Sequence, residues 1–405
     1  MKKWILFTLI SLSCLLSCKK GNNVVPPGLP PVTPEPSLLK TTTIRNDGTF
    51  LVDGKPFFPF GAYGLGWSAS EDLKVRALNE LIAAGFNIST VEDDGTTEMK
   101  KVIDNLLVLA ENSGLNKFKL QVGVSNSPNI TWAAQKYNNA YATFGYTIAD
   151  DGDDGKYSIA VLKQREVEVK GYDKKHITFL TLTGWDQSRR SQASSYTSLS
   201  DAGGYQCYPI GFARNSDWEV SSALTQTYLR TLAYVQSATL VNKPMMMHLQ
   251  TFNWAGQSAA PRYPTVAELR NMLYSGLAAG IKGVISYDFS MDLKNNQPLL
   301  WDEFKILRRD VSSLEAALMN GKLTRVDTGD QELVSSYWIN NDLCYMVVVN
   351  TSYTASKNIS IALPATYNGT KTSLFSRMPN TLSVSGTNFS GTIGAQEVQV
   401  YSIAK

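Results

Sequence analysis

Residues 264–289, PTVAELRNMLYSGLAAGIKGVISYDF, contain a helix signal followed directly by a strand signal. Thr265 and Glu268 stand at the spacing of a capping box, which predicts that a helix begins there. The helix is expected to cover 264–280, and KGVISYDF, residues 282–289, is expected to form the strand after it. A helix joined to a short apolar strand is the repeating unit of α/β folds with a parallel sheet.

The same unit recurs between about Lys40 and Asn320. Predicted strands lie at 57–62, 86–92, 117–124, 142–149, 176–184, 205–211, 243–252 and 282–289. Predicted helices lie at 70–84, 97–113, 129–140, 156–171, 217–238, 264–280 and 301–319. Eight strands alternating with helices over ~250 residues predict an α/β fold of the (β/α)8 TIM barrel type. A doubly wound sheet would instead carry a Gly-rich phosphate turn after its first strand, and GAYGLGW, residues 61–67, does not match that fingerprint.

The two ends of the chain differ from this alternating region. Residues 1–18 are predicted to be a signal peptide, because two lysines precede an apolar stretch that is too short to span a bilayer. This stretch ends in LLSC, which resembles the lipobox of bacterial lipoproteins and by that resemblance makes Cys18 the lipidated residue. Ordinary secretion with cleavage nearby is the alternative. Residues 19–40 are Pro-rich and are expected to be an extended linker.

Residues 321–405 consist of short β-rich runs separated by Asn, Gly and Thr turns, without a helical period. This pattern predicts a small C-terminal antiparallel β-sandwich after a barrel that covers 41–320. With Cys18 lipidated, the protein is expected on the bacterial cell envelope, anchored to the outer membrane on its periplasmic or surface side. We expect it to be a monomer.

The composition excludes several classes of function. A formal charge of +3 without a basic run argues against nucleic acid as a partner. After processing only Cys207 and Cys344 remain, so neither a disulfide framework nor a thiolate metal site is implied. The two histidines, His176 and His248, are interpreted as structural, which leaves a Ser-His-Asp triad or a His-rich metal site poorly supported. No cofactor is predicted.

In a TIM barrel, reactive groups lie at the C-terminal ends of the strands and in the loops after them. The acidic residues at these positions are Glu92, Asp93, Asp94, Asp150, Asp151, Asp153, Asp186 and Asp288. The aromatic and amide residues there are Tyr63, Trp67, Trp185, Tyr208, Gln250, Phe252, Trp254 and Tyr287. Aromatic rings stack on sugars, and paired carboxylates hydrolyse glycosides, so this rim fits a carbohydrate site. The alternative is that polar loops and core-capping aromatics are simply common in barrels.

The acidic run DDGDDG, residues 150–155, also raises the question of calcium. An EF-hand loop needs an acidic residue twelve positions from its first ligand, and here that position falls on Val161 or Leu162. The EF-hand is therefore excluded, while an irregular calcium site stays an alternative. No metal is predicted.

Four stretches resemble glycoside hydrolase barrels of the clan A type, over about residues 44–320. They are LVDGKPFFPFGAYG at 51–64, AAGFNISTVEDD at 83–94, YQCYPIG at 205–211 and RYPTVAELRNMLYSGLAAGIKGVISYDF at 262–289. The resemblance places Asp151 where these enzymes often carry their acid/base glutamate. It also places Gln250 where clan A enzymes have a nucleophilic glutamate, and a neutral amide cannot act as that carboxylate.

Two functions are compatible with this pattern. The first is a glycoside hydrolase with Asp151 as general acid, beside Asp150, and with Asp288 or one of Glu92, Asp93 and Asp94 as the second carboxylate. The second is a non-catalytic protein that binds carbohydrate in the same aromatic cleft. Whether the chain is an enzyme is left open by the sequence.

Overall fold

We analysed a computed structural model that describes residues 40–65, 70–114, 116–124, 130–183, 191–212, 222–258, 260–287, 291–364 and 366–405. The expected signal peptide, the lipidation site Cys18 and the linker up to residue 39 lie outside these ranges. The barrel and the C-terminal strands belong to one compact unit.

Eight parallel strands form a closed barrel, in which β11 pairs with β4 to complete the circle. The strands are β4 (Phe60–Ala62), β5 (Ile88–Glu92), β6 (Lys119–Gly123), β7 (Thr143–Ala149), β8 (Ile177–Leu182), β9 (Ala202–Cys207), β10 (Met245–Gln250) and β11 (Val284–Tyr287). The predicted TIM barrel is therefore confirmed.

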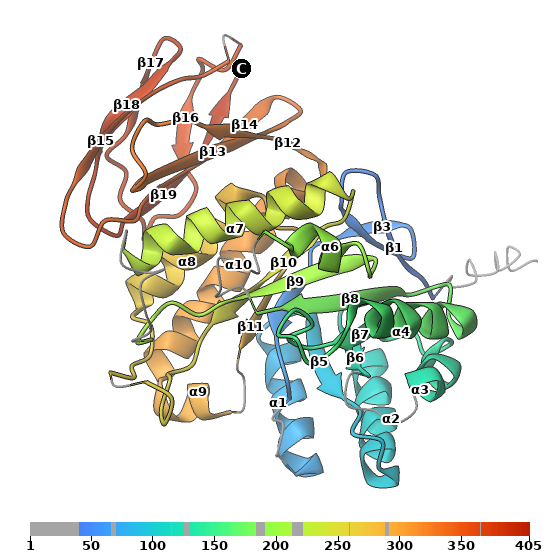
Figure 1. The fold of residues 1–405 in the computed structure, drawn as a ribbon. Coiled ribbons are helices and arrows are strands. Elements are labelled where there is room, and N and C mark those ends of the chain that lie inside the picture. Colours follow the sequence, from blue (N-terminus) through green and yellow to red (C-terminus); the bar gives the residue numbers. More distant parts are fainter. Residues whose placement is uncertain are drawn as a thin grey trace, which may run out of the picture. The chain divides into compact units, whose positions relative to one another are not determined.

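Helices connect the strands and pack outside the barrel, as Figure 1 shows. They are α1 (Glu71–Ala83), α2 (Thr97–Asn112), α3 (Ile130–Tyr137), α4 (Ile159–Tyr172), α6 (Ala193–Thr197), α7 (Ala223–Leu240), α8 (Val266–Ala279), α9 (Asp292–Asn296) and α10 (Pro298–Asn320). The capping box at the start of α8 is present, and Gly280 ends that helix with a φ of 96°. The short helices α6 and α9 were not predicted. Within the described ranges, none of the helices has the length and apolar character needed to cross a membrane.

Strand β9 begins three residues and ends four residues earlier than the sequence suggested, at Ala202–Cys207 instead of 205–211. Its two glycines resemble a turn, but barrel packing requires a glycine here. A Cβ atom on Gly204 would come within 2.6 Å of the Phe179 ring and 2.9 Å of His248 Nε2. Tyr208 therefore follows the end of the strand.

The interior of the barrel is filled by one apolar cluster contributed by the strands and by the N-terminal hairpin. That hairpin comprises β1 (Thr42–Ile44), β2 (Phe50–Val52) and β3 (Lys55–Phe57). The rings of Phe50 and Phe57 lie 5.5 and 5.7 Å from the ring of Phe144, which is near the start of β7. The hairpin thus closes the N-terminal end of the barrel, and a ligand can enter from the opposite end.

After α10 the chain forms two antiparallel sheets, which confirms the predicted β-sandwich. The first sheet has the order β12 (Lys322–Val326), β13 (Leu333–Asn340), β14 (Leu343–Asn350), β19 (Val398–Ala404) and β16 (Lys371–Ser373). The second has the order β15 (Lys357–Ala362), β18 (Asn388–Ile393) and β17 (Ser383–Ser385). The strands β16, β17 and β18 were missed because they are short or rich in Ser, Gly and Asn, which have low strand propensity.

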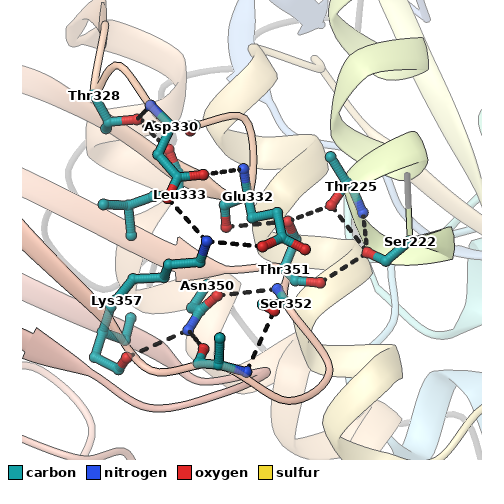
Figure 2. Close-up of polar contacts among 12 residues, drawn as sticks. Ser222, Thr225, Thr328, Asp330, Glu332, Leu333, Asn350, Thr351, Ser352 and Lys357 are labelled. Atoms are coloured by element: carbon teal, nitrogen blue, oxygen red, sulfur yellow. Dashed lines mark hydrogen bonds and ion pairs between the residues drawn. The ribbon is translucent and has the colours of Figure 1, made fainter. Parts of the chain in front are cut away.

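The sandwich is held to the barrel by polar contacts at the start of α7, which Figure 2 shows. Ser222 Oγ donates to the Thr351 carbonyl oxygen at 2.9 Å, and the hydroxyls of Thr225 and Thr351 lie 2.7 Å apart. On the sandwich side, Lys357 Nζ lies 2.9 Å from Asp330 and 2.8 Å from Glu332. The contacts of Ser222 and Thr225 join the segment after β14 to α7, while the Lys357 ion pairs lie within the sandwich.

Candidate functional site

A pocket of about 180 Å³ lies at the C-terminal end of the barrel. Its lining residues are Tyr63, Asp150, Asp151, Gln206, Tyr208, His248, Phe252, Trp254, Gln257 and Tyr287. Seven of these ten are residues that the sequence pointed to as site candidates. A larger hollow of about 470 Å³ lies beside β3 and the start of β5, but its Arg308 already pairs with Glu315 at 2.5 Å. We therefore place the candidate site in the smaller pocket.

The acidic loop after β7 has two carboxylates that line the pocket and one that holds the loop to the neighbouring strand. Asp151 has a φ of 51°, in the left-handed region, and this breaks the alternation of an extended strand so that Asp150 and Asp151 line the same pocket. The next residues attach the loop to β8. Gly152 N donates to the Thr181 carbonyl at 2.9 Å, and Asp153 Oδ1 accepts from Thr183 N at 2.8 Å. Asp153 thus shapes the loop, and the first two aspartates face the pocket.

The two pocket aspartates hold protons more tightly than ordinary carboxyl groups do. Burial, followed in size by the charge of Glu92, raises the pKa of Asp150 to about 6. Hydrogen bonding to Tyr63 and Gln206 lowers this pKa but does not offset the increase. Burial and then the charge of Asp150 raise the pKa of Asp151 to about 7, against a hydrogen bond from Gln206 Nε2. Burial raises the pKa of both neighbouring carboxyls toward neutrality, so the pair can hold and exchange a proton near neutral pH.

Glu92 lies at the end of β5, where it is hydrogen-bonded to Tyr63 and its charge acts on Asp150. The Tyr63 hydroxyl donates to Glu92 Oε1 at 3.1 Å. Burial, followed by the charges of Glu92 and Asp150, raises the pKa of Tyr63 well above its usual value, so the phenol stays protonated. Glu92 is not itself among the pocket-lining residues. Its charge acts on Asp150 from beside the pocket.

Four aromatic rings form one wall of the pocket. The Phe252 ring is central, with its centroid 5.0 Å from that of Trp254, 5.1 Å from that of Tyr208 and 5.2 Å from that of Tyr287. Trp254 Nε1 donates to the Tyr208 carbonyl at 3.3 Å, which ties the segment after β10 to the one after β9. The wall is therefore braced by the main chain, and it offers ring faces and edges to a ligand.

Gln250 lies at the end of β10 but does not line the pocket. Its Nε2 donates to the carbonyl oxygens of Ile210 at 2.8 Å and Phe252 at 3.2 Å, and its Oε1 accepts from Ile210 N at 2.8 Å. The side chain is fully buried. Because both ends of the amide are used, Gln250 holds the Tyr208 loop in place. Its expected contact with a substrate stays a prediction.

Three lining residues, Gln206, His248 and Gln257, were not predicted for the site. His248 was interpreted as structural, and it is buried, with burial lowering its pKa to about 3, yet its ring forms part of the pocket. It stands two positions before Gln250, so strand alternation could have indicated its inward direction. Gln206 was missed because the predicted strand began too late for its phase to be read.

The remaining candidates lie elsewhere. Asp93 Oδ1 accepts from Gly95 N and Asp94 Oδ1 from Thr96 N, both at 2.8 Å, so these carboxylates stabilise the turn before α2. His176 Nδ1 lies 2.7 Å from Asp173 in the protein interior, as expected for a structural histidine. The candidates Trp67, Trp185, Asp186 and Asp288 lie outside the described residues. Within those residues no group of three His, Cys, Asp or Glu side chains could hold a metal ion.

Comparison with known proteins relates the fold to solved structures. No protein-family model matches the chain, and no curated protein sequence matches it. A glycoside hydrolase family 5 protein from Bacteroides vulgatus has a TM-score of 0.64 at 14% identity, covering 91% of this chain and 94% of the other. A family 27 β-L-arabinopyranosidase from Geobacillus stearothermophilus, solved with arabinose, has a TM-score of 0.61 at 11% identity, covering 90% and 99%.

A third solved structure, a family 30 xylanase from Clostridium acetobutylicum, has a TM-score of 0.53 at 12% identity, covering 86% of this chain and 96% of the other. At such identities the likeness establishes the fold. The chain therefore shares its barrel architecture with glycoside hydrolases, in agreement with the expected clan A-like fold.

Proposed function

We propose that the protein is a glycoside hydrolase that cleaves a glycosidic bond in the pocket at the C-terminal end of its barrel. The observation that carries this proposal is the position of Asp150 and Asp151. Both carboxylates line one small pocket together with four aromatic rings. Carboxylates and aromatic faces in one pocket suit the oxocarbenium-like chemistry and the apolar ring faces of sugars. The structural neighbours named above as glycoside hydrolases add support.

Asp151 is assigned as the general acid. Burial keeps its carboxyl protonated near neutral pH, so it can give a proton to the leaving glycosidic oxygen as the bond to the anomeric carbon breaks. Asp150 is assigned as the partner, because it lines the same pocket beside Asp151, and burial and the charge of Glu92 raise its affinity for a proton. It would take a proton from the water that attacks the anomeric carbon. The charge of Glu92, which is hydrogen-bonded to Tyr63, raises the pKa of Asp150.

A specific observation favours a second candidate function, carbohydrate binding without catalysis. The position where related barrels carry a nucleophile is a neutral amide, and that amide is fully engaged with the main chain of Ile210 and Phe252. A barrel that has lost its catalytic pair would still keep the aromatic wall. In that case the pocket binds a sugar and leaves the bond intact.

A screen of aryl glycosides and polysaccharides separates the two functions. Wild type, Asp151→Asn and the control Asp94→Asn, whose carboxylate stabilises a turn outside the pocket, are compared under identical conditions. The hydrolase predicts turnover that falls at least ~100-fold in Asp151→Asn, in line with the contribution of a general acid, and that persists in the control. Glycan binding by wild type without turnover of any substrate would reject the hydrolase and support the binder.

A further inference from the structure

We propose that the pocket accepts a single terminal sugar ring, whose hydroxyl groups are bound by Tyr208, His248 and Asp150, so that the protein acts on chain ends. This inference rests on the proposed function for the cleavage step, whereas the class of ligand is argued from the pocket alone.

Three buried polar atoms at the pocket have no hydrogen-bond partner among the residues that the structure describes. They are Tyr208 Oη, His248 Nε2 and Asp150 Oδ1, contributed by the loop after β9, by β10 and by the loop after β7. A buried polar group without a hydrogen-bond partner is energetically unfavourable. Of the sixteen buried side-chain atoms without a partner in the described residues, these three gather at one pocket, where a ligand can complete their hydrogen bonds.

The chemistry of these three groups suits neutral hydroxyls. Burial keeps the His248 imidazole and the Tyr208 phenol uncharged, while Asp150 accepts hydrogen bonds. A hydroxyl can both donate and accept, so neighbouring hydroxyls on one ring can satisfy a phenol, an imidazole nitrogen and a carboxylate together. An anionic ligand would instead meet the carboxylates of Asp150 and Asp151.

The size of the pocket sets how much of a glycan can enter. Sites that enclose drug-sized ligands measure ~300–1,000 Å³, and this pocket is about 180 Å³. Trp254, which is 6% exposed, and Gln257, on the segment after β10, both contribute to its lining. One sugar ring fits this volume, and under this proposal it is the terminal ring of a chain. The scissile bond then lies at the end of a chain, beside Asp151.

Free monosaccharides provide the test, because they need no hydrolysis. Glucose, galactose, xylose and arabinose are titrated into wild type, Tyr208→Phe and the matched control Tyr337→Phe, whose ring packs in the sandwich, with ligand-observed NMR as readout. At least one sugar is expected to bind wild type and the control equally. Loss of the Tyr208 hydroxyl is expected to weaken that sugar about 5- to 10-fold, the equivalent of one hydrogen bond of ~1–1.5 kcal/mol.

Choline serves as a competing probe, since an aromatic wall with carboxylates could also hold a cation. Binding of choline with no binding of any monosaccharide overturns the inference. So does cleavage of a polysaccharide into long internal fragments by a protein that binds no monosaccharide, although the hydrolase would then stand. Monosaccharide binding that depends on Tyr208, without hydrolysis of any glycoside, supports the inference and rejects the proposed catalytic function.

Discussion

The Glu92 carboxylate lies over Gly123, where a Cβ atom would come within 2.2 Å of its oxygen. The two residues are direct partners at the ends of β5 and β6. A glycine at this position of the third barrel strand therefore creates the space that the carboxylate occupies. In this position Glu92 accepts a hydrogen bond from the Tyr63 hydroxyl, and its negative charge raises the pKa of the neighbouring Asp150.

Gly123→Ala is expected to displace Glu92 and to disturb the proton affinity of Asp150. We predict a loss of ~1–3 kcal/mol of unfolding free energy, typical of overpacking, together with a fall in glycosidase activity of at least ~10-fold. Urea unfolding and initial rates on a cleaved aryl glycoside measure the two effects. Gly171→Ala is the matched control, because a Cβ there meets no atom within 4 Å. An unchanged activity in Gly123→Ala would contradict the assigned role of Glu92.

The raised pKa of Asp151 predicts a pH-dependent cost in stability. Its value of about 7 in the folded state exceeds its ordinary value of 3.8, so the stabilising effect of the bound proton is complete below pH 4 and is lost as pH rises through 7. Asp151→Asn lacks this dependence. It should therefore gain ~4 kcal/mol relative to wild type between pH 4 and pH 8, since each of the roughly three pKa units between 3.8 and about 7 corresponds to ~1.4 kcal/mol.

Denaturant unfolding of both proteins at the two pH values tests this difference. Asp342→Asn, which removes an aspartate that is 83% exposed, should show almost no change between pH 4 and pH 8. A wild type that loses no stability relative to Asp151→Asn on going to pH 8 would argue against a buried, proton-binding Asp151.

Gln250→Glu should not create a nucleophile. A carboxylate cannot donate to the carbonyl oxygens of Ile210 and Phe252, and its charge would be buried beside them. We expect ~2–3 kcal/mol of destabilisation and no gain in hydrolysis, measured by thermal unfolding and by aryl glycoside turnover. Gln257→Glu, at an exposed lining position, should leave the melting temperature nearly unchanged. A more active Gln250→Glu protein would show that this side chain reaches the substrate.

Asp173 stabilises the fold at a distance from the pocket. Its carboxylate accepts from Tyr146 Oη at 2.7 Å and from Lys175 N at 2.8 Å, and it lies 2.7 Å from His176 Nδ1. Burial raises its pKa, but these hydrogen bonds outweigh burial and hold the pKa below 3.8. The stabilisation is therefore present above pH 4 and is lost as pH falls through the lowered pKa.

Asp173→Asn is expected to cost ~3–5 kcal/mol at pH 7, as for other broken buried pairs, and less at pH 3. At a temperature where the variant is folded, sugar binding should equal that of wild type. Unfolding curves at both pH values and a binding titration provide the check, and an equal cost at pH 3 and pH 7 would contradict the assignment.

The strand and helix pattern of the sequence was sufficient for the barrel and for seven of the ten residues that line the candidate pocket. Apolar runs ended by turn signals located all eight barrel strands, and parallel strands bring their C-terminal ends to one rim. Asp150, Asp151, the aromatic residues that follow β9 and β10, and Tyr287 at the end of β11 could therefore be assigned to a common rim from the sequence. Local sequence suffices here because strand order and strand direction follow from the repeating unit.

The direction of individual side chains depended on contacts between segments far apart in the chain. Because Asp151 has a left-handed φ, the side chains of two adjacent aspartates line the same pocket. No periodic pattern in the sequence encodes that angle. The Gln250 amide forms its hydrogen bonds with the main chain of the loop after β9. His248, two residues earlier, lines the pocket instead. The sequence by itself determined the barrel and therefore which strand ends meet at one rim. Only the tertiary structure, through packing around glycines 123 and 204 and through long-range hydrogen bonds, decided which of the residues at that rim face a ligand.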